Sequence, residues 1–347
     1  MKTQQYFKHA VLAVALSLTT GTIHATEITG AGSTFIYPIL SKWAAAYRTQ
    51  TGASVNYQSI GSGGGIKQIE AKTVDFGATD MPMKPEELAK DDLVQFPIIN
   101  GAIVTVIHLE GIKANEVKLT GTLIADIFMG KIKKWDDKAI AAINKDVKLP
   151  NKDISVVHRS DGSGTSFIFS NYLSKVSPEW KTKIGEGTAV TWPTGVGGKG
   201  NEGVANFVKQ IDGSIGYVEY AYAVQNNMTY TQVQNHAGKF IAPNDESFAA
   251  AAAGVDWSKA PGYYLIMTDA GGAKSWPIAG STFILMHKNQ TNAAQGTEAL
   301  KFFKWAYAQG EASAKEMHYV PIPLRAAKDI EAKWKAEIKG VEFNKSL

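Results

Sequence analysis

Short apolar runs alternate with amphipathic stretches along most of this 347-residue chain. Runs rich in β-branched and aromatic residues, bounded by glycine or polar clusters, predict strands. The alternation is clearest where Val74, Phe76 and Ala78 are separated by single residues. The strands predicted in this way lie at residues 73–80, 102–109, 154–159, 214–222 and 282–288.

Other stretches place their apolar residues three or four positions apart, which is the spacing of one helical face. Residues 37–47, 297–310 and 329–338 have this pattern. Thr297 stands where an N-cap residue is expected, and Gly310 stands where that helix should end. Strands that alternate with helices, over a length sufficient for two domains, predict a protein of the α/β class.

The first 25 residues do not follow this alternation. Lys2 and Lys8 precede an apolar run at residues 10–18, and the small residue Ala25 follows it. A span across a bilayer needs roughly 20 apolar residues, so this run is too short to be a membrane anchor. The pattern is that of a cleaved signal peptide, which we predict at residues 1–25. We therefore expect an exported protein that diffuses freely in a periplasm.

Composition and charge narrow the function further. With 44% apolar and 20% charged residues, the chain is typical of a globular protein. Loss of the two signal-peptide lysines lowers the formal net charge from +4 to +2, which is too small to indicate binding to nucleic acid or to an anionic membrane. The chain has no cysteine, and its histidines lack metal-ligand spacing, so we expect neither disulfides nor a metal site.

Three segments share a turn rich in glycine and hydroxyl residues, followed by a helical pattern: residues 30–40, 59–69 and 161–169. At a helix start, backbone N–H groups lack intrahelical partners and the helix dipole is positive. Glycine lets a ligand approach the backbone closely, and serine and threonine add hydroxyl donors. The three turns together predict an anion-binding site.

Arg159 and Asp161 begin the third turn and have two interpretations. They could form a surface ion pair. Alternatively, Asp161 could hold the guanidinium plane of Arg159 while the other guanidinium donors face an oxyanion.

Asp80 follows a predicted strand, and by itself it is typical of a turn. Neither Ser62 nor Ser163 lies in the G-x-S-x-G motif of a serine hydrolase.

One stretch, GKGNEG at residues 198–203, matches the G-x-G-x-x-G pattern of dinucleotide-binding proteins literally. That pattern must follow a strand directly, and the preceding residues include Pro193 and two glycines. We therefore predict a flexible loop before a helix, and no cofactor.

Several ordered stretches resemble one family closely. The segments GAGSTF, VNYQSIGSGGG, VDFGATDMP, FMGKIKKWDD, RSDGSGTSF and GSIGYVEYAYA are similar to the periplasmic phosphate-binding proteins of bacterial ABC-type phosphate transporters. The resemblance covers essentially the whole chain after residue 25. It implies a protein that is not an enzyme, that needs no cofactor, and whose partners are inorganic phosphate and membrane permease subunits. It also implies a monomer.

The resemblance carries the phosphate site over motif by motif. His158 departs from some relatives, which carry a second basic residue there. Asp161 is implied as the partner that orients the arginine. The implied phosphate ligands are Thr34, Phe35, Ser62, Asp80, Arg159, Ser163, Gly164 and Thr165.

The implied fold is a two-lobed α/β periplasmic-binding-protein fold, with the ligand cleft between lobes joined by hinge strands. The first lobe would comprise residues 26–107 and 280–347, and the second residues 108–279. Two alternative functions are a phosphate-ester hydrolase and a binder of another tetrahedral oxyanion. Hydrolysis would need an activated nucleophile or a metal-bound water, and the sequence has a signature of neither.

Overall fold

A computed structural model describes residues 26–343 of the chain. The predicted signal peptide therefore lies outside the described residues. The chain begins with strands and helices in alternation: β1 (Glu27–Gly32), α1 (Tyr37–Thr51), β2 (Ser54–Ser59), α2 (Ser62–Glu70), β3 (Phe76–Thr79), α3 (Pro85–Lys90) and β4 (Leu93–Ile107).

The middle of the chain contains shorter strands. Its elements are β5 (Lys118–Leu119), α4 (Gly121–Phe128), α5 (Lys138–Ile143), β6 (Ser155–Arg159), α6 (Gly164–Val176), α7 (Pro178–Lys183), β7 (Val196–Gly198), α8 (Gly200–Gln210), β8 (Ser214–Glu219), α9 (Tyr220–Gln225), β9 (Thr229–Tyr230), β10 (Gln232–Gln234), β11 (Phe240–Ile241), α10 (Asp245–Ala252) and the 3-10 turns η1 (Trp257–Lys259) and η2 (Pro261–Tyr263). The last elements are β12 (Ala279–His287), α11 (Ala293–Gln309), α12 (Glu311–Glu316), β13 (Val320–Pro321) and α13 (Leu324–Glu337).

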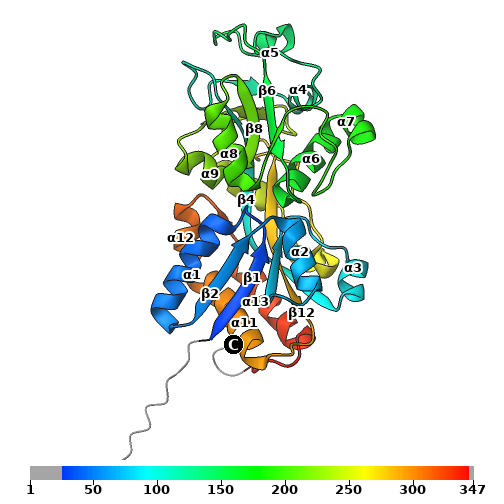
Figure 1. The fold of residues 1–347 in the computed structure, drawn as a ribbon, viewed down its shortest axis with the longest axis vertical. Coiled ribbons are helices and arrows are strands. Elements are labelled where there is room, and N and C mark those ends of the chain that lie inside the picture. Colours follow the sequence, from blue (N-terminus) through cyan, green and yellow to red (C-terminus); the bar gives the residue numbers. More distant parts are fainter. Residues whose placement is uncertain (1–25, 344–347) are drawn as a thin grey trace, which may run out of the picture.

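The long strand β4 joins two halves of the molecule. The main sheet has the order β2-β1-β3-β12-β4-β8-β6-β7, and β1, β2 and β3 are parallel to one another. Residues 93–102 of β4 pair antiparallel with β12, and residues 103–107 pair antiparallel with β8. In Figure 1, the elements from α4 to α9 gather at the upper end, and α1 to α3 with α11 to α13 gather at the lower end. The boundaries 107/108 and 279/280 stay predictions.

Helices α11 and α2 contribute to two different core clusters, the larger of which extends through both halves. Phe303 of α11 meets the rings of Phe76 and Phe96 edge to face, with centroids 5.0 and 5.6 Å apart. Ile69 of α2 packs instead in a second buried cluster with Ala31. Burying apolar surface stabilises a fold by about 25 cal/mol per Å². The packing of these apolar side chains therefore holds in place the strand ends that carry the polar residues described below.

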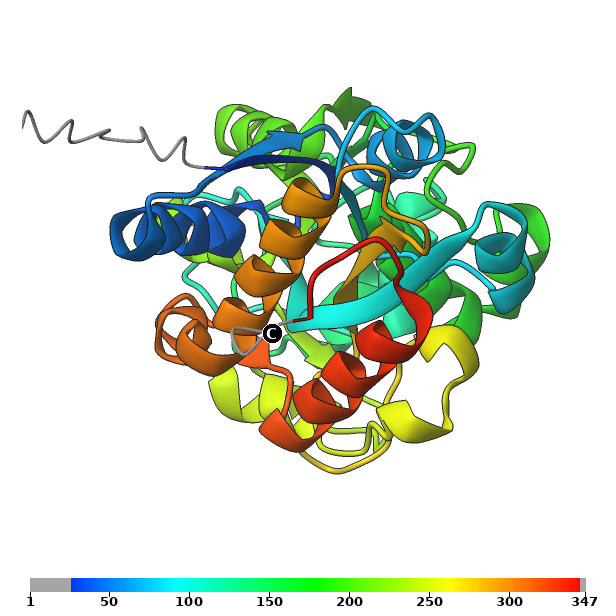
Figure 2. The ribbon, with the colours of Figure 1, turned by 90° about the horizontal axis from the view of Figure 1, so that it is seen from below.

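Both ends of the described chain are attached to helix α11. The side-chain amide of Gln295 donates to the backbone oxygen of Glu27 at 3.3 Å, and the backbone N–H of Glu342 donates to the hydroxyl of Thr297 at 2.9 Å. Figure 2, seen from below, shows α11 (orange) near both β1 (dark blue) and the C-terminal segment (red). The first and last described residues therefore lie in the same half of the molecule.

Several element boundaries differ from the sequence predictions. Helix α11 begins at Ala293 and is capped by the Asn292 side chain, so Thr297 is not its N-cap. The predicted strand at residues 214–222 ends at Glu219, because the Glu219 carboxylate accepts from Ala221 N and starts α9 there. No helix within residues 26–343 is both long enough and apolar enough to cross a membrane.

Candidate functional site

The three glycine- and hydroxyl-rich turns converge, although they are far apart in sequence. Helix α2 begins at Ser62, and helix α6 begins at Gly164 behind the N-cap Ser163, whose hydroxyl accepts from Ser166 N at 2.9 Å. The backbone N–H of Gly63 donates to the backbone oxygen of Gly162 at 3.0 Å. The second and third turns therefore contact each other directly.

Gly164 is a point of close approach between the start of α6 and the end of β3. A Cβ atom built at Gly164 would overlap the Ser62 hydroxyl oxygen and the Asp80 carboxylate. Only glycine therefore allows the start of α6 to come this near to the end of β3. The N-terminal end of α6 therefore lies next to the Asp80 carboxylate.

Asp80 follows the last residue of β3, and only 2% of its surface is exposed. Its Oδ1 accepts a hydrogen bond from the Thr282 hydroxyl at 2.6 Å, and its Oδ2 accepts one from the Ser33 hydroxyl at 2.6 Å. Its backbone N–H donates to the Ser62 hydroxyl at 3.1 Å. Burial raises the pKa of Asp80 to about 6, although the hydroxyl hydrogen bonds and the positive charge of Arg159 act in the opposite direction.

Arg159 ends β6 and is 3% exposed. Its Nε donates to Asp161 Oδ1 at 2.7 Å and its Nη2 donates to Asp161 Oδ2 at 2.5 Å, so the pair is bidentate. Its Nη1 donates to the Thr165 hydroxyl at 3.2 Å. Burial would raise the pKa of Asp161, but the hydrogen bonds and charge of Arg159 outweigh it and the pKa is lowered. Asp161 therefore holds the guanidinium as an ionised partner.

Thr34 and Phe35 precede the first residue of α1, Tyr37. The Thr34 hydroxyl accepts hydrogen bonds from Asn201, and the Thr34 backbone oxygen accepts one from the Tyr222 hydroxyl at 2.7 Å. The backbone N–H of Phe35 donates to the Ser33 hydroxyl at 3.0 Å, and the Phe35 ring is fully buried. The first turn therefore contacts residues that follow β4 in the chain.

The surroundings of His158 disfavour its protonated form. Its ring stacks on Trp192 with centroids 5.0 Å apart, and its Nδ1 lies 3.0 Å from the backbone oxygen of Arg159. Burial lowers the pKa of His158, and the bond to Arg159 opposes this only in part. The Arg159 guanidinium is thus the cation that the third turn contributes.

The buried residues of this cluster that were not predicted from the sequence include Ser33, Thr282 and Asn201. Ser33 lies inside the first predicted turn, so the signal that marks Thr34 and Phe35 also covers it. Thr282 lies in the apolar strand β12, where a single threonine is ordinary. Asn201 lies in the 198–203 stretch that was predicted to be a flexible loop.

That stretch is ordered, so the prediction of a loop is wrong. The short strand β7 precedes it, and α8 begins at Gly200, whose φ of +71° favours glycine. A Cβ atom built at Gly198 would lie too close to the backbone nitrogen of Val204, so there is no room for a side chain. A three-residue strand that contains two glycines has too little apolar pattern to be found in sequence.

The site combines buried hydroxyl donors, helix starts and one guanidinium around one buried carboxylate. Such an arrangement suits a small oxyanion that carries a hydrogen, because the carboxylate can only accept when ionised. Within the described range 26–343, no group of three or more His, Cys, Asp or Glu residues is placed to hold a metal ion.

Comparison with known proteins identifies the family. Residues 18–309 match the PBP superfamily domain. The phosphate-binding protein PstS of Xylella fastidiosa is 56% identical over 315 residues, which covers 91% of this chain and 86% of that protein. PstS of Pasteurella multocida is 54% identical over 329 residues, which covers 95% and 96% of the two chains. The chain belongs to the PstS family of phosphate-binding proteins.

A solved structure supports the fold of this PstS-family chain. The structure of a high-affinity periplasmic phosphate-binding protein bound with phosphate covers 92% of this chain and 100% of its own, with a TM-score of 0.72 at 18% identity. The resemblance stated from the sequence and the two-lobed α/β periplasmic-binding-protein fold are both confirmed.

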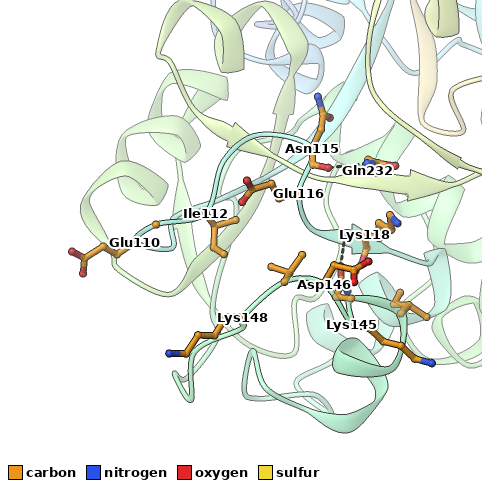
Figure 3. Close-up of a pocket in the computed structure, with 13 residues that line it drawn as sticks. Glu110, Ile112, Asn115, Glu116, Lys118, Lys145, Asp146, Lys148 and Gln232 are labelled. Carbon is orange, nitrogen blue, oxygen red and sulfur yellow. Dashed lines mark hydrogen bonds between the residues drawn. The ribbon is translucent and has the colours of Figure 1, made fainter.

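A separate cavity of about 600 Å³ lies elsewhere in this PstS-family chain, and none of the predicted site residues lines it. Figure 3 shows Lys118, Lys145 and Lys148 around it together with Glu110 and Glu116. Charges of both signs are interspersed on its walls, and two of its polar groups bond each other: Gln232 Nε2 donates to the backbone oxygen of Asn115 at 2.8 Å. This lining favours no single class of ligand.

Proposed function

We propose that this chain binds inorganic phosphate at the cluster of Ser62, Asp80, Arg159 and Thr165, and delivers it to an ABC-type importer. The observation that carries the proposal is the buried Asp80 carboxylate beside two helix starts and the Arg159 guanidinium. The remaining predicted ligands, Thr34, Phe35, Ser163 and Gly164, belong to the same three turns. The names of the PstS relatives and the phosphate bound to the structural neighbour support it.

Asp80 supplies the selectivity for a protonated anion. At neutral pH, phosphate carries at least one P–OH group, and an ionised carboxylate accepts that hydrogen as a short charge-assisted bond. Sulfate has no hydrogen to donate and would place an oxygen lone pair against Asp80. Two like charges in a buried site repel by several kcal/mol, so sulfate is rejected by the same group that holds phosphate.

The hydroxyls and the guanidinium replace the water that phosphate loses on entering the site. Serine and threonine hydroxyls and backbone N–H groups of helix starts donate to the anion, and Arg159 neutralises part of its charge. Asp161 accepts from Nε and from one N–H of Nη2, and Thr165 accepts from Nη1, which leaves one N–H on each terminal nitrogen of Arg159 for the anion.

A competition titration tests the proposal. Ligand-free protein is titrated calorimetrically with phosphate, sulfate and arsenate at pH 7.5 and constant ionic strength. We expect tight binding of phosphate, binding of arsenate because it also carries a hydrogen, and much weaker binding of sulfate. Equal affinity for sulfate and phosphate would contradict the role of Asp80, and hydrolysis of a chromogenic phosphate ester would favour an enzyme.

The cellular context is part of the same proposal. Residues 1–25 have the pattern of a signal peptide, which supports export to the periplasm. Closure of two lobes on the anion would present the permease with a surface that depends on ligand. The protein acts as a monomer in this scheme, which light scattering of the purified chain would check.

A further inference from the structure

Asn201 is the second residue of α8, is completely buried, and uses its whole amide group. Its Oδ1 accepts a hydrogen bond from the backbone N–H of Glu219 at 2.9 Å. Its Nδ2 donates to the hydroxyl oxygens of Thr34 at 2.7 Å and Thr165 at 3.1 Å, and its backbone N–H donates to Thr34 Oγ1 at 3.2 Å. One side chain thus connects two predicted phosphate ligands that lie 131 positions apart in the sequence.

The orientation of this amide is fixed by its neighbours. The backbone N–H of Glu219 can only donate, so the amide oxygen of Asn201 must face it. The amide NH₂ group then faces the two threonine hydroxyls. Rotating the amide by half a turn would place a donor against the Glu219 N–H group, which would leave two buried donors unpaired.

This orientation determines how the two hydroxyls can bond. A hydroxyl group has one hydrogen and two acceptor lone pairs. Thr34 Oγ1 accepts from both nitrogens of Asn201, and Thr165 Oγ1 accepts from Asn201 Nδ2 and from Arg159 Nη1. With both lone pairs of each oxygen in use, the only remaining bond that either hydroxyl can form is one in which it donates.

We infer that Asn201 is a positioning residue that fixes Thr34 and Thr165 as hydrogen-bond donors toward the bound anion. The inference rests on the proposed function and adds a role for the 198–203 stretch. Without Asn201, each hydroxyl could turn its hydrogen toward a protein acceptor and present a lone pair to the ligand. Asn201 also orders the two donors before binding, so less conformational freedom is lost when phosphate enters.

A double-mutant cycle separates this role from simple packing. Asn201→Ala is compared in the wild-type background and in a Thr34→Val/Thr165→Val background, by calorimetric titration with inorganic phosphate. We expect Asn201→Ala to weaken binding at least tenfold in the wild type and less than twofold when both hydroxyls are absent. Asn206→Ala, at an exposed position of the same helix, is the matched control and should bind as the wild type does.

The outcomes are distinct. An equal loss in both backgrounds, or no loss in the wild type, would overturn the inference, because Asn201 would then not act through the hydroxyls. If the wild type and the Asn206 control do not bind phosphate, the proposed function fails instead.

A second variant is used if Asn201→Ala is found unfolded by circular dichroism. Asn201→Asp has the same shape, but its ionised carboxylate accepts from both threonines. We expect a loss of at least a hundredfold relative to the wild type at pH 8. The loss should shrink as the pH falls to 5, because the carboxyl group introduced by this substitution can donate again once it is protonated. A loss that is the same at both pH values would contradict the inference.

Discussion

Replacing Asp80 by asparagine removes the charge of this side chain while keeping its shape. The rise of the Asp80 pKa from 3.8 to about 6 means that ionising this carboxyl group costs about 3 kcal/mol more than it does in water. At pH 8, a pKa of about 6 also means that protonating Asp80 to accommodate sulfate costs about 2.7 kcal/mol, whereas the P–OH hydrogen of phosphate bonds to the ionised carboxylate directly. Asp80→Asn should therefore bind sulfate on the order of a hundredfold more tightly than the wild type, since 1.4 kcal/mol is a factor of ten.

Phosphate should respond differently to the same change. It loses a charge-assisted hydrogen bond, which is worth about 1.5–3 kcal/mol, but the amide oxygen of the new side chain still accepts from P–OH. We expect a loss of roughly tenfold. The selectivity for phosphate over sulfate then falls by about three orders of magnitude in total.

The assay is calorimetric titration of both anions into ligand-free protein at pH 8 and fixed ionic strength. Glu86→Gln, which removes one negative charge from the exposed start of α3, controls for long-range electrostatics and should leave both affinities unchanged. If Asp80→Asn folds normally and its sulfate affinity equals that of the wild type, the carboxylate is not the group that rejects sulfate.

The remaining predictions use the same site. Arg159→Ala should lower phosphate affinity at least tenfold at constant salt, measured by calorimetry, because a buried cation that faces the anion is lost. Gly164→Ala should lower phosphate affinity at least a hundredfold, because its methyl group would overlap the Ser62 hydroxyl and the Asp80 carboxylate, whereas Gly254→Ala, with open space around it, should have no effect. Sulfate affinity of the wild type should rise as the pH falls through about 6, because Asp80 becomes protonated while sulfate stays ionised; a flat profile would argue against the raised pKa. In thermal melts without ligand, Asp80→Asn should be more stable than the wild type above pH 6 and equal to it below pH 4, because a carboxyl whose pKa is raised by folding loses stability as the pH rises through that window.

Much of the site could be predicted because helix starts have a local signature. Glycine and hydroxyl residues before an amphipathic run mark Ser62 and the Ser163–Thr165 turn without any tertiary information. Asp80 was recognised only through the family resemblance, since an aspartate after a strand is ordinary. The sequence pattern alone could not show that this carboxylate is almost fully buried, which is the property that gives it chemical importance.

The residues that sequence reasoning missed act through tertiary contacts. Thr282 is separated from Asp80 by 202 positions and reaches it only because β12 pairs antiparallel with β3. Asn201 depends on a three-residue strand that has almost no pattern of its own. Such partners are set by sheet register and by close backbone packing, which leave little trace in local periodicity.

The attachment of both ends of the described chain to α11 limits how the proposed lobe closure can be followed by fluorescence. Reporter groups placed next to Glu27 and Glu342 would travel together with one half of the molecule, so the distance between them would stay nearly constant if the other half moves. A phosphate sensor built on this scaffold therefore needs one chromophore inserted into a surface loop of the α4–α9 half, with the second next to either of these residues. An energy-transfer pair placed in that way would convert anion capture into an optical signal.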